Sequence, residues 1–275
     1  KKRFRTHRNR LKKNIFWFIL DLLFEREYFA NIKNKIEMRD LSDSTVNNGE
    51  GKKWAQYYYD GHINSLEDLK KTQVGLMTMY EANPIFQNMI NFINKNNFQE
   101  NENTYIIQLG SSSGKDLEFF LKLFPKLSFI STDINDEILS FQKKKYNYKN
   151  LQYFKCYAED IDRCIESFNI SDKNLIIFSC DCLQYVNPYY LKEFFSKIKN
   201  YKNLNFFLIE PINLLFLDNK KKQISEFRGA TSFSHRYDQY VFNSNAKIVE
   251  SKIIRPYSKD DMNHRNTGHF YLHMK

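Results

Sequence analysis

The sequence predicts an α/β protein built on a mostly parallel sheet of seven strands, with an antiparallel last strand and an N-terminal helical segment. From Thr104 onward, apolar strand-like runs alternate with segments of helical periodicity, which is typical of parallel sheets. A small-residue turn, residues 110–114, follows the first run. Only a loop, residues 255–267, separates the last two runs, and parallel neighbours would need a longer helical crossover there.

Residues 1–52 predict a basic helical arm with a polar linker. Residues 1–40 hold 12 Lys and Arg against 5 Asp and Glu, whereas the formal charge of the whole chain is +10. The arm is therefore expected either to pack on the domain or to form a basic amphipathic helix on an anionic membrane surface or a partner chain. The rest of the chain is nearly neutral, which argues against a nucleic-acid-binding surface on the main domain.

Residues 53–103 predict a helical cap packed on the core. Ser65 with Asp68 fits a helix start, and Pro84 opens a second helix. Apolar residues then recur at helical spacing, namely Ile85, Met89, Ile90 and Ile93.

Residues 104–275 predict the main domain, with its elements in regular order. The expected strands are 104–109, 127–133, 151–156, 174–179, 204–210, 246–254 and 268–274. The expected helices are 115–124, 135–146, 160–168, 188–200, 217–227 and 236–243. The sequence contains no stretch of about 20 apolar residues, so no membrane span is predicted.

The segment from Thr104 to Asp133 predicts a strand–loop–helix–strand unit that suits a nucleoside ligand. The loop of small residues lets backbone N–H groups approach a ligand closely, next to the start of a helix. Asp133 ends the second strand, where a carboxylate can accept both ribose hydroxyls.

The loop resembles the first motif of class I S-adenosylmethionine-dependent methyltransferases, acid-x-Gly-x-Gly-x-Gly. Gly110 and Gly114 match the motif, Ser112 replaces its middle glycine, and Gln108 stands where an acid is usual. Asp133 matches the acid that follows the second strand. The resemblance covers residues 104–275 and implies a Rossmann-like domain with S-adenosyl-L-methionine as cofactor.

The resemblance also implies which residues contact this cofactor. Ile134 would press on the adenine face, and Ala158 with Glu159 follow the third strand where the family contacts the adenine amino group. Tyr157 departs from the family pattern there. The predicted cofactor-binding residues are Gln108, Leu109, Gly110, Ser111, Ser112, Gly114, Asp133, Ile134, Ala158, Glu159, Ser179 and Cys180.

Two residues are predicted to be catalytic. Asp181 lies where the mouth of the fourth strand opens, so it could bind or deprotonate a methyl acceptor or cap a loop. His235 lies in a polar segment after the fifth strand, and an imidazole is suited to take a proton from a hydroxyl. Arg228 and Arg236 are nearby in sequence and could grip an anionic acceptor.

These observations predict methyl transfer to a small-molecule or glycan-type acceptor at a hydroxyl, as in the biosynthesis of surface polysaccharide. Three alternatives remain: an RNA methyltransferase, a nicotinamide-dependent oxidoreductase, and a non-catalytic scaffold with this fold. The loop lacks the G-x-G-x-x-G pattern of dinucleotide binding. Identity of the acceptor, oxygen or nitrogen as the methylated atom, and oligomeric state are left open.

The cysteines and histidines predict no metal site. Cys156, Cys164, Cys180 and Cys182 form no C-x-x-C pair, which is consistent with reduced thiols in a cytoplasmic protein, at most at the inner face of the membrane. The C-terminal histidines lack a Cys or acid at metal-ligand spacing.

Overall fold

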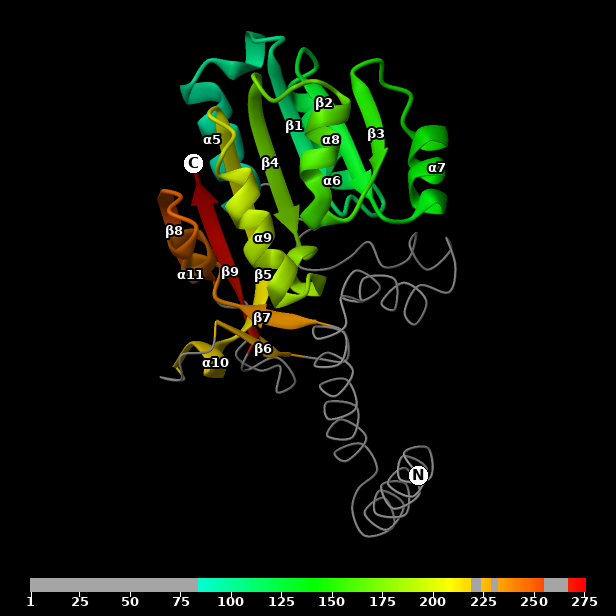
Figure 1. The fold of residues 1–275 in the computed structure, drawn as a ribbon. Coiled ribbons are helices and arrows are strands. Elements are labelled where there is room, and N and C mark those ends of the chain that lie inside the picture. Colours follow the sequence, from blue (N-terminus) through cyan, green and yellow to red (C-terminus); the bar gives the residue numbers. More distant parts are fainter. Residues whose placement is uncertain (1–83, 219–223, 229–231, 255–266) are drawn as a thin grey trace, which may run out of the picture. The chain divides into compact units, whose positions relative to one another are not determined.

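A computed structural model of the protein describes residues 84–218, 224–228, 232–254 and 267–275 (Figure 1). The predicted arm and most of the predicted cap lie outside the described residues. The main sheet has seven strands. Across the sheet their order is β3 (Leu151–Lys155), β2 (Ser128–Asp133), β1 (Thr104–Leu109), β4 (Asn174–Cys180), β5 (Leu204–Asn213), β9 (Thr267–Met274) and β8 (Ile248–Ile254).

The strand directions confirm the predicted Rossmann-like sheet. β3, β2, β1, β4 and β5 run parallel to one another, whereas β9 is antiparallel to both of its neighbours, β5 and β8. The last strand thus inserts between β5 and β8, so the strand before it forms the edge of the sheet.

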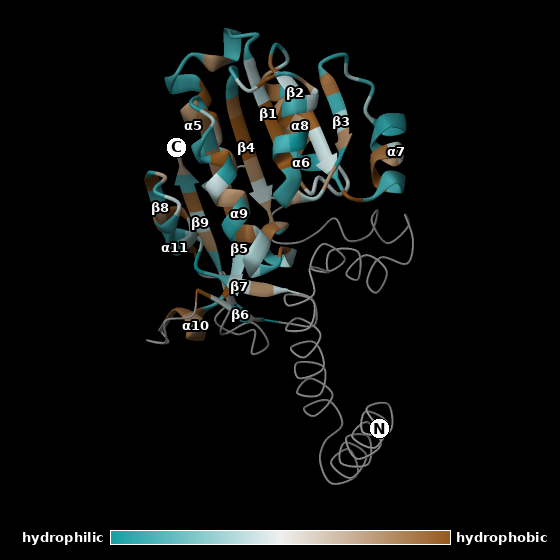
Figure 2. Cartoon of the chain, in the orientation of Figure 1, coloured by the Kyte–Doolittle hydropathy of each residue, from teal (hydrophilic) through white to brown (hydrophobic). Residues whose placement is uncertain are grey.

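Helices cover both faces of this sheet (Figure 1). The α-helices within the described residues are α5 (Pro84–Lys95), α6 (Lys115–Leu123), α7 (Asp136–Lys145), α8 (Ile161–Ser167), α9 (Pro188–Ile198), α10 (Leu214–Asp218) and α11 (Tyr237–Asn243). Buried side chains of α5 and α6 share one core with one face of the strands. Those of α8, α9 and α11 form a second core on the opposite face. Figure 2 shows hydrophobic residues along the inner strands of the sheet, and buried strand residues belong to both cores.

Local sequence explains where these helices begin. Pro84 opens α5 as predicted, because a proline at the first helical position lacks only an N–H that would be unpaired there. Asn187 caps α9 by accepting from the N–H of Tyr189 (2.9 Å). α6 begins directly after Gly114, which places a helix N-terminus beside the small-residue loop.

The predicted helix at 217–227 is wrong. β5 runs on to Asn213, whose Oδ1 accepts from the N–H of Leu215 (3.0 Å), so the helix begins earlier, at Leu214. Its predicted end is instead the short strand β6 (Ser225–Phe227), which pairs antiparallel with β7 (Phe233–His235). Helical spacing of apolar residues did not reveal this strand because three-residue strands show too little periodicity.

Candidate functional site

The predicted site residues gather at one edge of the sheet. Because β1, β2, β4 and β5 are parallel, their carboxyl ends lie at the same edge. That edge carries the loop 110–114, Asp133, the segment from Ser179 to Gln184, and Glu210 of β5. In open α/β sheets this edge is where ligands bind.

The loop after β1 requires residues that tolerate left-handed backbone. Gly110, Ser112 and Gly114 have φ angles of 59°, 48° and 74°. A Cβ atom on Gly110 would lie 2.4 Å from Sγ of Cys182, so glycine permits the loops after β1 and β4 to touch. Ser112 adopts the same region without being glycine, at the position where the resembled motif has its middle glycine.

Side chains of α7 hold this loop in place. Gln142 Nε2 donates to Ser111 Oγ (2.8 Å) and to the carbonyl of Ser112 (2.6 Å). The hydroxyl of Tyr146 donates to the carbonyl of Ser113 (3.0 Å). Neither clamp was predicted. The available signal is a glutamine on the buried face of α7, where it is 1% exposed and needs polar partners.

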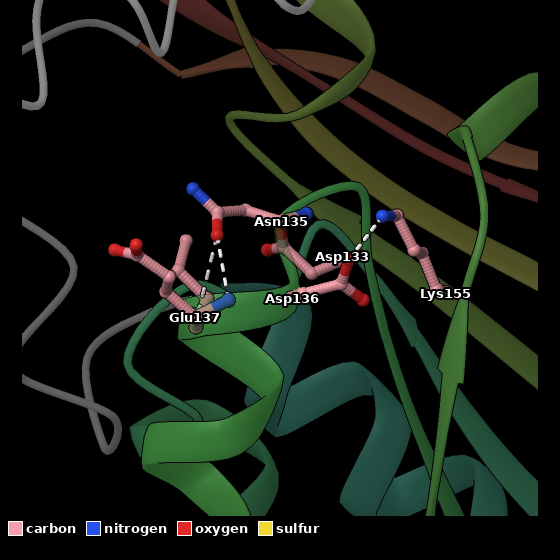
Figure 3. Close-up of polar contacts among 6 residues, drawn as sticks. Asp133, Asn135, Asp136, Glu137 and Lys155 are labelled. Carbon is pink, nitrogen blue, oxygen red and sulfur yellow. Dashed lines mark hydrogen bonds and ion pairs between the residues drawn. The ribbon is translucent and has the colours of Figure 1, made fainter.

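Asp133 completes the loop from the end of β2 (Figure 3). It is 1% exposed, and its carboxylate accepts from the N–H groups of Ser112 (3.1 Å) and Asn135 (3.0 Å). Asn135, and not Asp133, caps α7, by accepting from the N–H groups of Glu137 and Ile138. A carboxylate has about four acceptor positions and can accept from several donors at once.

The other predicted cofactor-binding residues at the ends of β1 and β2 differ in which of their atoms could face a ligand. Gln108 Nε2 donates to Asp116 Oδ2 (3.2 Å), while its Oε1 is buried and has no hydrogen-bond partner within the described part of the chain. Leu109 is fully buried, so only its backbone can face a ligand. Ile134 is half-buried directly after Asp133.

The segment after β3 forms the neighbouring wall. Ala158 and Glu159 lie in a short 3₁₀ helix, η3 (Ala158–Asp160), and each is 8% exposed. Asp160 takes the N-cap position of α8 without a side-chain capping bond. The structure thus brings both predicted residues to the same edge as Asp133.

Glu210 organises the loop after β4, and the sequence analysis missed it. It is fully buried, and its Oε1 accepts from Ser179 Oγ (2.5 Å) and from the N–H groups of Cys182 (3.1 Å) and Leu183 (3.0 Å). Its Oε2 accepts from the N–H of Gln184 (3.2 Å). An acid within the otherwise apolar run of β5 was the available signal, because buried carboxylates require donors.

Asp181 lies in this loop and has an unusual backbone φ angle and an unusual carboxyl pKa. Its φ is 56°, a region that non-glycine residues rarely adopt. Burial raises the pKa of its carboxyl to about 7, which Arg228 opposes and Asp116 reinforces. Burial also raises the pKa of Glu210 to about 8, with Asp181 adding to the shift and the hydrogen bond from Ser179 opposing it.

His235 lies in β7 and is fully buried, which its polar sequence context did not predict. Its Nδ1 is 2.7 Å from Ser225 Oγ, which in turn is 2.7 Å from the hydroxyl of Tyr240. Burial lowers the pKa of His235 to about 3, and the carbonyls of Val186 and Leu183 oppose this only in part. The ring is therefore neutral at pH 7 but a weak base. Its catalytic role stays a prediction.

Carboxyl groups gather around the predicted methyl site. Apart from burial, the main influences on the Cys180 thiol are Asp116, Asp181 and Glu210, and all of them raise its pKa. The pKa of the Cys182 thiol is raised by burial and then by carboxylates of β5, β2 and η3, namely Glu210, Asp133 and Glu159. Those of these groups that are ionised favour a cationic ligand at this edge over an anionic one.

Within the described residues, no group of three His, Cys, Asp or Glu side chains could hold a metal ion. All four cysteines are free thiols. No helix in the described ranges is both long and apolar enough to cross a membrane.

No protein-family model matches the chain, and no curated protein matches its sequence. Among solved structures, the chain resembles an S-adenosylmethionine-dependent methyltransferase from Anabaena variabilis at 14% identity, over 84% of this chain and 94% of that one, with a TM-score of 0.49. A methyltransferase from Mesorhizobium loti shows 9% identity over 71% and 100% of the two chains, with a TM-score of 0.47.

A third similar structure is a methyltransferase from Aquifex aeolicus, at 11% identity over 76% of this chain and 98% of that one, with a TM-score of 0.46. These three proteins are all described as S-adenosylmethionine-dependent methyltransferases. Likenesses of this strength do not decide the chemistry of this chain, which has to follow from the residues at its own site.

Proposed function

We propose that this carboxyl edge binds S-adenosyl-L-methionine and that the protein transfers the cofactor's methyl group to a hydroxyl of a small or glycan-type acceptor. The observation that carries the proposal is the left-handed loop 110–114, closed by Asp133 and lying near further carboxyl groups. S-adenosylmethionine is a sulfonium cation with a ribose and an amino acid tail. Each of these groups has a chemical counterpart at this edge.

The residues fit the cofactor part by part. The Asp133 carboxylate at the end of β2 is the type of group that accepts ribose hydroxyls, and the half-buried Ile134 beside it offers an apolar surface for adenine. Gln108 Oε1 is a buried acceptor without a described partner, which suits an ammonium donor. When bound, the cofactor supplies an electrophilic methyl group on sulfur.

Asp181 is the general base in this proposal. An ideal catalytic base has a pKa near the working pH, and burial brings the pKa of Asp181 to about 7. A hydroxyl acceptor would lose its proton to this carboxylate. Glu210 fixes the loop that presents Asp181, through three backbone N–H groups, and thereby acts as a positioning residue.

The alternatives fit the site less well. A nicotinamide dinucleotide would place a pyrophosphate, with two negative charges, among the carboxylates that already surround Cys182. An RNA acceptor would bring its phosphates near the same carboxyl groups. A scaffold without a cofactor leaves the buried Oε1 of Gln108 unexplained.

Calorimetric titration tests the assignment directly. S-adenosylmethionine should bind with one site per chain, and NADH should give no heat of binding. A protein that binds NADH in preference, or neither compound, would overturn the proposal. Vesicle sedimentation with full-length protein and anionic lipid tests the further expectation that residues 1–40, which lie outside the described residues, attach the enzyme to a membrane where surface glycans are made.

A further inference from the structure

Buried polar atoms without partners gather beside the loop after β4. Among the described residues, Asp181 Oδ1, Arg228 Nε and the hydroxyl of Tyr237 are buried without a hydrogen bond. Most buried polar groups in folded proteins are paired, so each exception needs an explanation. Tyr237 is fully buried, so contact with bulk solvent does not explain its unpaired hydroxyl.

These three groups belong to one cluster although they come from distant parts of the chain. Arg228 contributes electrostatically to the pKa of both Asp181 and Tyr237. Its guanidinium also donates to Gln184 Oε1, and Gln184 Nε2 donates to the carbonyl of Asp181 (2.9 Å). Glu210 and Cys182 of the same site raise the pKa of the Tyr237 hydroxyl. Asp181 and Arg228 are only half-buried, so the cluster reaches the surface through them.

The donors and acceptors in this cluster specify their complement. Arg228 Nε–H can only donate, and an ionised Asp181 can only accept, whereas the hydroxyl of Tyr237 can do either. A partner must therefore offer both an oxygen acceptor and a hydroxyl donor. A protonated amine would leave the Arg228 donor unpaired, and a phosphate would leave Asp181 unpaired.

The charges of the cluster agree with this. One guanidinium, Arg228, stands against two carboxyl groups, Asp181 and Glu210, whose burial already opposes ionisation. An additional anion would raise the cost of ionising both acids. The arginine is thus better suited to hydrogen-bond a neutral oxygen. The sequence had instead led us to expect that Arg228 holds an anionic acceptor.

We propose that Asp181, Arg228 and Tyr237 form the acceptor subsite of the enzyme and select a neutral acceptor that carries a hydroxyl next to a second oxygen, as in the vicinal diol of a sugar. This inference rests on the proposed methyl transfer. In it, the reacting hydroxyl donates to Asp181, and the neighbouring oxygen accepts from Arg228 and Tyr237.

The test uses three matched probes, D-glucose, D-glucosamine and D-glucose 6-phosphate, which share one ring and differ in charge. Full-length protein saturated with S-adenosylhomocysteine is examined by saturation-transfer NMR. Glucose should receive saturation, and the charged probes should receive less. A stronger signal from either charged probe, or none from all three, overturns the subsite.

Tyr237→Phe removes only the unpaired hydroxyl, and Tyr240→Phe is its matched control, because the Tyr240 hydroxyl is bonded to Ser225. Tyr237→Phe should weaken glucose binding about fivefold, the effect of one neutral hydrogen bond, without lowering the melting temperature. Tyr240→Phe should lower the melting temperature and leave glucose binding unchanged.

Two outcomes for Tyr237→Phe would contradict the subsite. If glucose binding is unchanged and the melting temperature rises, the Tyr237 hydroxyl is an unpaired buried group that binds no ligand. A lowered melting temperature would show a structural partner such as a bound water. Titration of the same proteins with S-adenosylmethionine separates the acceptor subsite from the proposed methyl transfer. If the wild-type protein does not bind the cofactor, the methyl transfer itself is refuted.

Discussion

The two halves of the carboxyl edge satisfy their buried polar groups in different ways. In the cofactor half, around β1 and β2, Asp133, Gln142 and Tyr146 hold the loop 110–114 through hydrogen bonds within the protein. In the acceptor half, around β4 and β5, Asp181, Arg228 and Tyr237 each keep a buried atom without a described partner. Under the proposed function, the first half is thus built before its ligand arrives, except for the buried Oε1 of Gln108, whereas the second is completed by its ligand.

Both halves hold a non-glycine residue with left-handed backbone, Ser112 and Asp181, but the acceptor half also carries the carboxyl groups with raised pKa values. Asp181 combines a left-handed backbone with a pKa of about 7. Strain and perturbed pKa values concentrate at functional sites because the chemistry needs groups that the fold would not otherwise favour. Substitutions in the acceptor half should therefore change turnover, and those in the cofactor half should change affinity for the cofactor.

Asp181→Asn should produce the largest effect of this kind. Loss of a general base lowers turnover by roughly 10²–10⁴, with the affinity for S-adenosylmethionine unchanged. Turnover of the wild type should fall as the pH drops below about 7, where Asp181 becomes protonated, and the variant should lose this limb. Initial rates of methyl transfer from labelled cofactor across pH 5–9 measure both. A fully active variant would leave His235 as the remaining candidate or favour a nitrogen acceptor.

Glu210→Ala should reduce stability more than any substitution in the cofactor half. It removes the acceptor of Ser179 and of the N–H groups of Cys182 and Leu183, and each donor left buried and unpaired costs about 1–3 kcal/mol. Urea unfolding should show a loss of about 3 kcal/mol or more. The exposed Glu102 is the control, and Glu102→Ala should stay within about 0.5 kcal/mol. Equal effects of both changes would refute the buried carboxylate as the organiser of this loop.

Asp133→Asn separates the halves from the other side. The variant weakens charge-assisted hydrogen bonds worth roughly 1.5–3 kcal/mol, so cofactor affinity should fall about ten- to hundredfold. Asp136→Asn is the matched control, since Asp136 is exposed and pairs with Lys155 (Figure 3). Calorimetry should find its affinity unchanged. Similar losses in both variants would indicate a general charge effect instead of direct contact.

The smallest expected effect is a dependence of stability on pH. The pKa values of Asp181 and Glu210 are raised in the folded state, to about 7 and about 8. Between their unfolded and folded pKa values, the native protein therefore binds more protons than the unfolded chain, and its stability falls as the pH rises. Urea unfolding should show a decrease of at least about 1 kcal/mol from pH 5 to pH 8.5. Asp181→Asn should flatten the curve, and a wild-type curve that rises instead would contradict both shifts.

The same contrast explains what could be predicted from the sequence. The parallel sheet, the antiparallel last strand and the cofactor loop follow from local signals: alternating periodicity, a small-residue turn and an acid at a strand end. Helix boundaries at Pro84 and after Gly114 follow from caps and turns. These features depend on neighbours in sequence, so a reader of the sequence can find them.

The acceptor half depends on contacts between distant segments. Glu210 meets the loop after β4 across 26 to 31 sequence positions. Arg228 meets Gln184 across 44 positions. No periodicity encodes such pairings, and the strand β6, which places Ser225 beside His235, is too short to show any. His235 therefore looked like an exposed base in the sequence, although the pairing of β6 with β7 buries it.

The position of β9 has a consequence for biosynthesis. β9 occupies an interior place, bonded to β5 along one side and to β8 along the other, although it is synthesised after both. Until residues 267–274 have left the ribosome, β5 remains an open edge and β8 has no strand to join. Unpaired strand edges promote aggregation. A nascent chain of this protein thus depends on its final strand, and slow translation just before residue 267 would prolong its most vulnerable stage.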